Sequence, residues 1–283
     1  MAIFTNRATL SYNGISVNSN TVTGNLLEVL AVTKTAVGDN YTPGEAVTYI
    51  ISITNTSTTP FVGVSVSDNL GEYPFGTGTV VPLEYVDGSA VYYQNGILQP
   101  SPTVSSTQPL TFTGISVPAG GNAIIVYEAQ TNGYAPLEAG STVTNEVAVT
   151  APGIATPATD SETVSVETAP LLSITKCLSP VNVSENGELT YTFTIQNSGN
   201  VAALEGAGVV VSDVFNPILS SITVTLNGSV LPATSYTYNE ATGEFATLPG
   251  VITVPAATYA QDPVTGLWVT TPGVTTVTVS GIV

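Results

Sequence analysis

Apolar and polar residues alternate with a period of two through most of this chain. The alternation is regular in AVTYIISITN (46–55), GELTYTFTIQN (187–197) and TTVTVSGIV (275–283). Gly, Pro or Asn residues bound each block, as expected for strands joined by turns. A period of two predicts half-buried antiparallel strands, and no stretch shows a convincing helical period. The pattern therefore predicts an all-β fold of the sandwich type.

The blocks recur in the same order, which indicates two copies of one fold in tandem. Each match keeps the alternation and the turn residues at its ends. The matched pairs are 26–37 with 170–181, 43–57 with 185–199, 62–70 with 208–215, and 117–133 with 270–283. We therefore expect two tandem β-sandwiches.

The first copy continues with a further strand pair in residues 138–169, and the second copy has no counterpart of it. A match to this ending lies at the front of the chain. FTNRATLSYNGISVNSNTVTGNLLE (4–28) resembles VTNEVAVTAPGIATPATDSETVSVE (143–167).

The chain thus reads as the end of one domain, a whole domain, and a domain that lacks its end. The expected division is a donor strand segment (1–27), a complete sandwich (28–169) and an incomplete acceptor sandwich (170–283). The alternative is that the first residues are a flexible leader with accidental similarity.

A sandwich without its last strand pair has an apolar groove and an unpaired sheet edge, and both favour the addition of a strand. Phe4, Asn6, Ala8 and Leu10 share one face of the first strand, so they are the predicted inward-facing donor residues. About five residues join this segment to the next domain, a reach of ~17 Å at most. We therefore expect it to complete a neighbouring subunit. Such a head-to-tail contact does not close on itself and gives a filament.

Composition excludes several classes of function. The formal net charge is −17 with three basic residues, so nucleic acid and anionic membrane surfaces are not expected partners. There is no His and one Cys, which removes the usual hydrolase triads, zinc sites and an internal disulfide framework. We expect no enzyme of an ordinary class, no cofactor and no metal. Calcium at GDNYTPGE (38–45) or YVDGS (85–89) is the alternative, although turns use Asp and Gly anyway.

Three polar residues of the first repeat fall on apolar faces of three different strands. Lys34 lies between Val32 and Ala36, Asp68 follows two inward valines, and Asn145 lies between two more. Burial lowers the pKa of a lysine and raises that of an aspartate, so a neutral amine meets an amide beside an acid that can polarise the amide carbonyl. These are the ingredients of a spontaneous isopeptide bond. The alternative is a buried Lys–Asp ion pair with Asn as a hydrogen-bond partner.

The second repeat has Lys176 and Asp213 at the matching positions, and its Asn is displaced to Asn6 in the donor segment. The motifs TK, SD and TN resemble those of the "conserved repeat" domain, found in tandem in bacterial surface proteins. That domain is similar to the immunoglobulin-like folds of Gram-positive pilins and adhesins. The resemblance implies two immunoglobulin-like β-sandwiches, the second completed by a neighbouring subunit.

The resemblance also implies a bond from Lys34 to Asn145 within one chain, with Asp68 as the catalytic acid. It implies a second bond from Lys176 of one subunit to Asn6 of the next, catalysed by Asp213. The expected protein is thus the structural subunit of an extracellular bacterial fibre on a cell or spore surface, with itself and an unknown anchoring protein as partners.

The opening residues lack a charged region followed by an apolar core, which a secretion signal would have. We therefore expect either that a signal was removed or that the protein leaves its cell by another route. The second possibility resembles an endospore appendage, which is made inside the mother cell and freed by lysis. The alternative function is a monomeric adhesin or stalk fragment that acts as a binding module.

Overall fold

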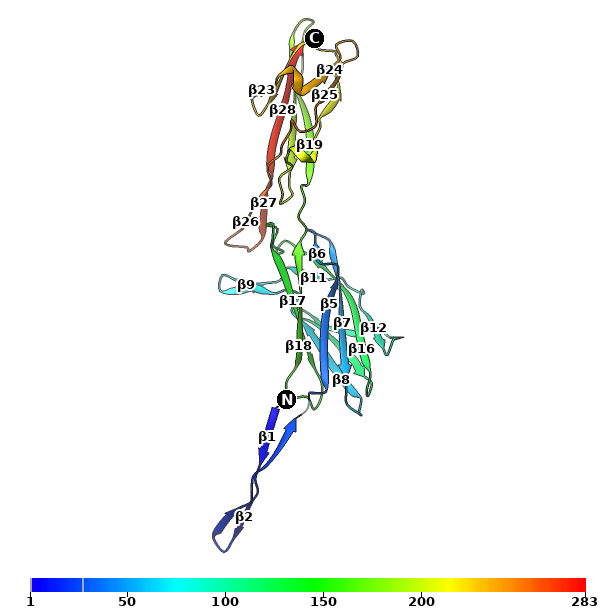
Figure 1. Ribbon diagram of the computed structural model, residues 1–283, viewed down its shortest axis with the longest axis vertical. Coiled ribbons are helices and arrows are strands. Elements are labelled where there is room, and N and C mark those ends of the chain that lie inside the picture. The colour runs from blue at the N-terminus through cyan, green and yellow to red at the C-terminus, as the bar shows by residue number, and fades with distance from the viewer. Residues whose placement is uncertain (1, 27) are drawn as a thin grey trace.

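The computed structural model describes residues 2–26 and 28–283, which form a long, narrow molecule built almost entirely of β-strands (Figure 1). The predicted all-β fold is confirmed. In the described part of the chain, the helical residues lie in two single 3₁₀ turns, η1 (Glu205–Ala207) and η2 (Ala233–Ser235). Met1 and Leu27, the ends of the predicted donor segment, lie outside the described residues. The division into three parts stays a prediction.

The first sandwich consists of two six-stranded sheets. Its strands are β5 (Leu30–Val37), β6 (Asn40–Tyr41), β7 (Ala46–Asn55), β8 (Phe61–Asp68), β11 (Leu83–Tyr85), β12 (Val91–Gln94), β13 (Ile97–Gln99), β14 (Thr103–Thr107), β15 (Leu110–Val117), β16 (Asn122–Thr131), β17 (Thr142–Thr150) and β18 (Ala158–Val166). One sheet has the order β13-β12-β16-β7-β5, with β11 also paired to β16. The other has the order β14-β15-β8-β17-β18-β6. A small hairpin, β9 (Tyr73–Phe75) and β10 (Gly78–Val80), stands apart from both sheets.

The core of the first sandwich lies between these two sheets. Ile51 of β7 and Tyr127 of β16 are buried from one side, and Val66, Phe112 and Val147 are buried from the other. Successive residues of a strand point to opposite faces, so the alternating sequence places one apolar row in this core. The β17–β18 hairpin pairs with β8 in one sheet and packs against the edge of β5 in the other.

The second sandwich is smaller. Its strands are β19 (Leu172–Ser179), β20 (Glu188–Asn197), β21 (Ser212–Val214), β22 (Ser220–Leu226), β23 (Ser229–Val230), β24 (Tyr236–Tyr238), β25 (Glu244–Thr247) and β28 (Gly273–Ile282), with a separate hairpin of β26 (Thr258–Gln261) and β27 (Trp268–Thr271). The sheets have the orders β19-β20-β28-β22-β23 and β21-β25-β24. Both β19 and β21 are therefore edge strands. The core includes Tyr191, Phe193 and Val279 from the larger sheet and Phe245 from the smaller.

Each sandwich has a buried asparagine at the end of an equivalent strand, and the two asparagines make equivalent hydrogen bonds to loop carbonyls. Asn55 Nδ2 donates to Thr59 O at 2.8 Å and Pro118 O at 3.0 Å. Asn197 Nδ2 donates to Val201 O at 2.8 Å and to the carbonyl of residue 255, also a proline, at 3.0 Å. A buried amide needs hydrogen-bond partners, and both asparagines find them at equivalent positions. This agreement supports the inferred repeat.

The N-terminal residues form a long exposed hairpin. Its strands are β1 (Ala2–Asn6), β2 (Thr9–Tyr12), β3 (Ile15–Asn18) and β4 (Val22–Leu26), with β1 paired to β4 and β2 to β3. Figure 1 shows this hairpin projecting from the end of the first sandwich that lies farthest from the second sandwich. We call residues 2–26 the donor hairpin.

Candidate functional site

Lys34, Asp68 and Asn145 come together in the core of the first sandwich. Their exposed fractions are 2%, 0% and 0%. Lys34 reaches the site from β5, Asp68 from the end of β8 and Asn145 from β17. The Lys34 ammonium forms an ion pair with Asp68 Oδ2. The structure thus gathers the three residues that the sequence placed on apolar faces. We call this group the first lysine cluster.

Tyr127 of β16 joins the first lysine cluster and was missed by the sequence analysis. Its hydroxyl donates to Asp68 Oδ2 at 2.6 Å, and accepts from Lys34 Nζ at 3.1 Å and from Asn145 Nδ2 at 3.2 Å. On the neighbouring strand, Tyr49 stacks on Tyr127 with ring centroids 5.6 Å apart. The Lys34 nitrogen lies 4.8 Å from the centroid of the Tyr49 ring. A lysine ammonium held over aromatic rings is desolvated but still attracted to their faces.

The expected hydrogen bond from Asp68 to the Asn145 carbonyl is not among the contacts of the cluster. Asp68 Oδ2 instead contacts Lys34 and Tyr127, and Asp68 Oδ1 accepts from Leu70 N at 3.0 Å. Asn145 Oδ1 and the Tyr49 hydroxyl are both buried without a hydrogen-bond partner. Asp68 does not contact the Asn145 carbonyl because the Tyr127 hydroxyl lies between the carboxylate and the amide. Asp68 is therefore linked to the amide nitrogen by two hydrogen bonds that meet at this hydroxyl.

Burial changes the protonation of this cluster. It lowers the pKa of Lys34, although the charge of Asp68 opposes the shift. It also raises the pKa of Tyr127 well above the ordinary value, and the neighbouring Asp68 adds to that rise. Tyr127 therefore stays protonated, and the neutral amine of Lys34 becomes accessible at lower pH than for an exposed lysine. A neutral amine beside a carboxamide and an acid can form an amide bond with release of ammonia.

Lys176 and Asp213 form an equivalent but more open cluster in the second sandwich. They make an ion pair, with side chains 40% and 18% exposed. The Lys176 nitrogen lies 4.3 Å from the centroid of the Tyr191 ring. Asn6 is absent from this cluster, because it lies in β1 opposite Val22 at the far end of the molecule (Figure 1). The structure brings Lys176 and Asp213 together within one chain and does not bring Asn6 to them.

The two lysine-bearing strands differ in how much of their surface is covered. In β5, Leu30 and Val32 are 7% and 9% exposed. At the same positions of β19, Leu172 and Ile174 are 38% and 54% exposed. All eight residues of β19 are exposed.

The strand pair next to β5 accounts for this difference. Lys34 N donates to Asp160 Oδ2 of β18 at 2.7 Å, and β18 packs beside β5. In the described residues, β19 is an edge strand that pairs with β20. The second sandwich therefore presents an open apolar edge at the place where the first sandwich holds its last hairpin.

The predicted donor residues lie in the donor hairpin with their side chains in solvent. Phe4 and Leu10 are 55% and 65% exposed, and Asn6 and Ala8 are exposed as well. The predicted continuous strand is interrupted, since β1 ends at Asn6 and β2 begins at Thr9. The pairing of the hairpin shifts by one residue between Asn6, opposite Val22, and Thr9, opposite Asn18, and this irregularity interrupts the strand.

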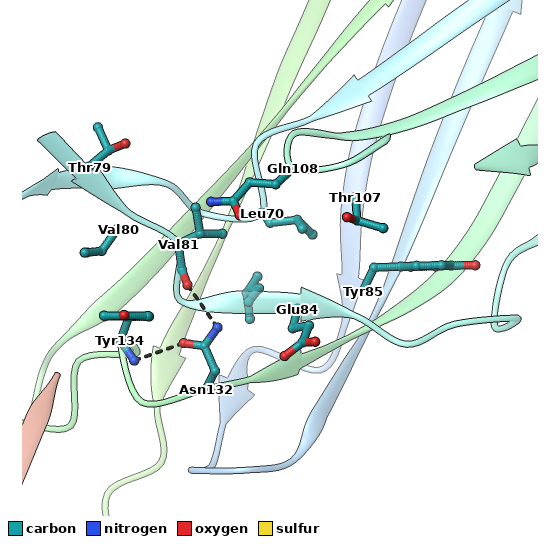
Figure 2. A pocket seen from close by; sticks show the side chains of 11 residues that line it. Leu70, Thr79, Val80, Val81, Glu84, Tyr85, Thr107, Gln108, Asn132 and Tyr134 are labelled. Atoms are coloured by element: carbon teal, nitrogen blue, oxygen red, sulfur yellow. Dashed lines mark hydrogen bonds between the residues drawn. The ribbon is translucent and has the colours of Figure 1, made fainter. Parts of the chain in front are cut away.

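One pocket of the first sandwich is lined by none of the residues of the two clusters. A pocket of about 420 Å³ in the first sandwich is lined by Glu84, Tyr134 and nine other residues. Figure 2 shows Asn132 in this pocket donating to Val81 O at 3.0 Å and accepting from Tyr134 N at 2.9 Å, so its amide is already occupied by backbone. Across residues 2–26 and 28–283, no group of three His, Cys, Asp or Glu residues could hold a metal ion. The same residues include no helix that is long and apolar enough to cross a membrane.

Comparison with known proteins finds weak structural likeness only. No family model and no curated protein matches the chain. The pilus backbone RrgB of Streptococcus pneumoniae is 12% identical with a TM-score of 0.36, over 86% of this chain and 55% of that one. A 35 kDa C-terminal fragment of the major pilin GBS80 of Streptococcus agalactiae is 11% identical with a TM-score of 0.34, over 87% and 91%.

The N-terminal domain of the Streptococcus gordonii adhesin Sgo0707 is 13% identical with a TM-score of 0.38, over 54% and 36%. This chain therefore spans about a third of the adhesin structure and about half of RrgB. At these TM-scores the likeness is too weak to define the fold, which the strand pairing of the two sandwiches defines.

Proposed function

We propose that this protein is the repeating subunit of an extracellular bacterial fibre. In this fibre, the donor hairpin of one subunit completes the second sandwich of the next. The observation that carries the proposal is the contrast between β5, which the β17–β18 hairpin covers, and β19, whose equivalent face is open. A hairpin with a sequence like that of β17–β18 stands exposed at the opposite end of the same molecule.

The first sandwich supplies the register for this contact. There, Val147 of β17 lies opposite Asp68 of β8, and Val149 lies opposite Val66. Transferred to the second sandwich, this pairing puts Ala8 opposite Asp213 and Leu10 opposite Val211. The edge strand β21 then gains backbone hydrogen bonds, and the open face of β19 is covered.

The register also brings the donated amide to the second cluster. Asn6 is two residues before Ala8, as Asn145 is two residues before Val147. Asn6 of one subunit therefore arrives beside Lys176 and Asp213 of the next. An amide bond between Lys176 and Asn6 then joins the two subunits covalently, and the bond from Lys34 to Asn145 locks the first sandwich within each subunit.

The geometry of the molecule favours a filament over a closed dimer. The donor hairpin and the acceptor edge lie at opposite ends of the long axis, so each contact leaves a free donor and a free acceptor (Figure 1). A heterologous contact of this kind propagates. A surface with a formal charge of −17 keeps neighbouring filaments apart. These features suit a fibre outside the cell with this chain as its own main partner.

Deletion of residues 2–20 tests the proposal. We expect the full chain to form unbranched filaments one subunit wide in negative-stain electron micrographs, and the shortened chain to stay monomeric because it lacks the inserted strands. Thr5→Asp in the full chain is the matched control, since it alters the donor hairpin on the outward face and should still polymerise. A full chain that remains monomeric, or a shortened chain that still polymerises, would refute the proposal.

A further inference from the structure

Tyr127 occupies the position that a proton carrier needs in the first lysine cluster. Its hydroxyl is within hydrogen-bond distance of the amine of Lys34, the carboxylate of Asp68 and the amide nitrogen of Asn145. It donates to the carboxylate and accepts from the two nitrogens, so its one proton and its lone pairs are all in use. The amide nitrogen it touches is the atom that leaves as ammonia in the proposed reaction.

We propose that the Tyr127 hydroxyl delivers the proton to the departing nitrogen of Asn145, as a catalytic residue of bond formation. The inference rests on the proposed function, because it assumes that the bond from Lys34 to Asn145 forms. It assigns the proton transfer to the leaving nitrogen to a residue other than Asp68. Asp68 acts on the amide through Tyr127, with which it shares a hydrogen bond of 2.6 Å.

Every proton that moves in this reaction has a donor and an acceptor among the three residues and Tyr127. Asp68 first takes a proton from the Lys34 ammonium, which leaves a neutral amine. The Lys34 nitrogen then attacks the amide carbon of Asn145 and forms the new C–N bond. Tyr127 gives its proton to the amide nitrogen and receives the proton held by Asp68, and Asp68 then receives the extra proton of the attacking nitrogen. The bond to the old nitrogen breaks and one ammonia leaves. Tyr127 is again a neutral hydroxyl, and Asp68, which began as the carboxylate, ends as the carboxylic acid with a proton that came from Lys34.

The second cluster provides an internal comparison, because it keeps the aromatic packing without this hydroxyl. Val279 lies opposite Tyr191, as Tyr127 lies opposite Tyr49. The space beside Tyr191 is filled by Phe215, whose ring stacks on it with centroids 4.9 Å apart. A ring therefore lies near each lysine, but only the first cluster has the bridging hydroxyl. We expect the bond of the second cluster to form more slowly than the bond of the first.

The test measures bond formation with time in the full chain carrying Lys176→Ala, which removes the second reaction. Chains made in a short cell-free pulse are quenched in denaturant at intervals, and intact mass reports the loss of ~17 Da per bond. Tyr127→Phe keeps the ring and removes the hydroxyl. We expect it to slow bond formation by about 100-fold, the lower end of the range for positioned proton transfer.

Tyr92→Phe is the matched control. Tyr92 is also buried, and its hydroxyl donates to Ser116 O at 2.6 Å away from the cluster. The control thus loses the same atom and a similar hydrogen bond, and should react at the parental rate. Thermal unfolding of both variants shows whether Tyr127→Phe folds as well as the control does.

The pH profile separates catalysis from a structural effect. If Tyr127 transfers the proton, Tyr127→Phe lowers the maximal rate and leaves the midpoint of the pH profile in place. An unchanged rate overturns the inference and leaves the proposed function standing. A midpoint moved along the pH axis with an unchanged maximum, or a slow reaction explained by poor folding relative to Tyr92→Phe, also overturns it. A parent chain that never loses ~17 Da refutes the covalent part of the proposed function and the inference with it.

Discussion

Phe4→Asp and Thr5→Asp form a pair of substitutions that tests the register of the donor hairpin. Both add one negative charge to neighbouring positions of β1, so any general repulsion between subunits is the same. Phe4 corresponds to Val143, which is 3% exposed in the first sandwich, and Thr5 corresponds to Thr144, which is exposed there. We therefore expect a large effect on assembly from Phe4→Asp and a small one from Thr5→Asp.

The magnitude follows from the exposure of the hairpin. Phe4 is 55% exposed in the free subunit, so assembly buries about half of a side chain whose complete burial is worth ~1.5–3 kcal/mol. An aspartate in its place must be neutralised to be buried, and at pH 7 protonation of a carboxyl with an ordinary pKa costs about 4 kcal/mol. The sum of about 5 kcal/mol raises the critical concentration for assembly more than about 1000-fold. Thr5→Asp remains in solvent and changes it by about 2- to 3-fold at most.

Sedimentation of filaments over a range of protein concentrations gives the critical concentration. The Lys176→Ala background is used for all chains, because a covalent lock would make assembly irreversible. Equal critical concentrations for Phe4→Asp and Thr5→Asp would refute the register, and a larger effect from Thr5→Asp would indicate a strand shifted by one residue.

Three further predictions address the acceptor edge and the two clusters. Ile174→Asp should raise the critical concentration far more than Thr175→Asp, since Ile174 lies on the open inward face of β19; similar values for both would contradict the proposed groove. Wild-type fibres should run as a ladder after boiling in denaturant with reducing agent, whereas Lys176→Ala fibres should run as monomers; a ladder in the variant would place the bond elsewhere. In Asn145→Ala, which cannot form the first bond, the free energy of unfolding should rise with pH between the lowered pKa of Lys34 and 10.5, because the unfolded state binds more protons in that window. Urea titrations at several pH values measure this, and stability that falls as pH rises toward 9 would contradict it.

The alternation of residues was enough to predict strands and the inward direction of the cluster residues. Lys34 and Asp68 lie on apolar faces because side-chain direction in a strand depends only on parity, which a sequence displays directly. The same reasoning placed Asn145 on an apolar face, and the comparison of the two repeats predicted an apolar groove and an unpaired sheet edge in the second. These are properties of single strands and of their immediate neighbours in the sandwich.

The sequence did not reveal Tyr127, because a tyrosine on an apolar face reads as an ordinary core residue. Its role depends on the rotamer of one side chain and on three partners from three other strands, and no local pattern encodes that geometry. The break between Asn6 and Thr9 was missed for a related reason. It reflects a one-residue shift in the pairing of the hairpin, which the alternation of residues in one strand does not display.

Electron cryomicroscopy of the assembled fibre at side-chain resolution would show directly where the donor hairpin lies. We expect residues 4–10 of each subunit to lie as a strand in the second sandwich of the next, with Ala8 opposite Asp213 and Leu10 opposite Val211. We also expect continuous density between Asn6 and Lys176. A fibre in which the donor hairpin lies outside the second sandwich of the neighbouring subunit would contradict the proposed function.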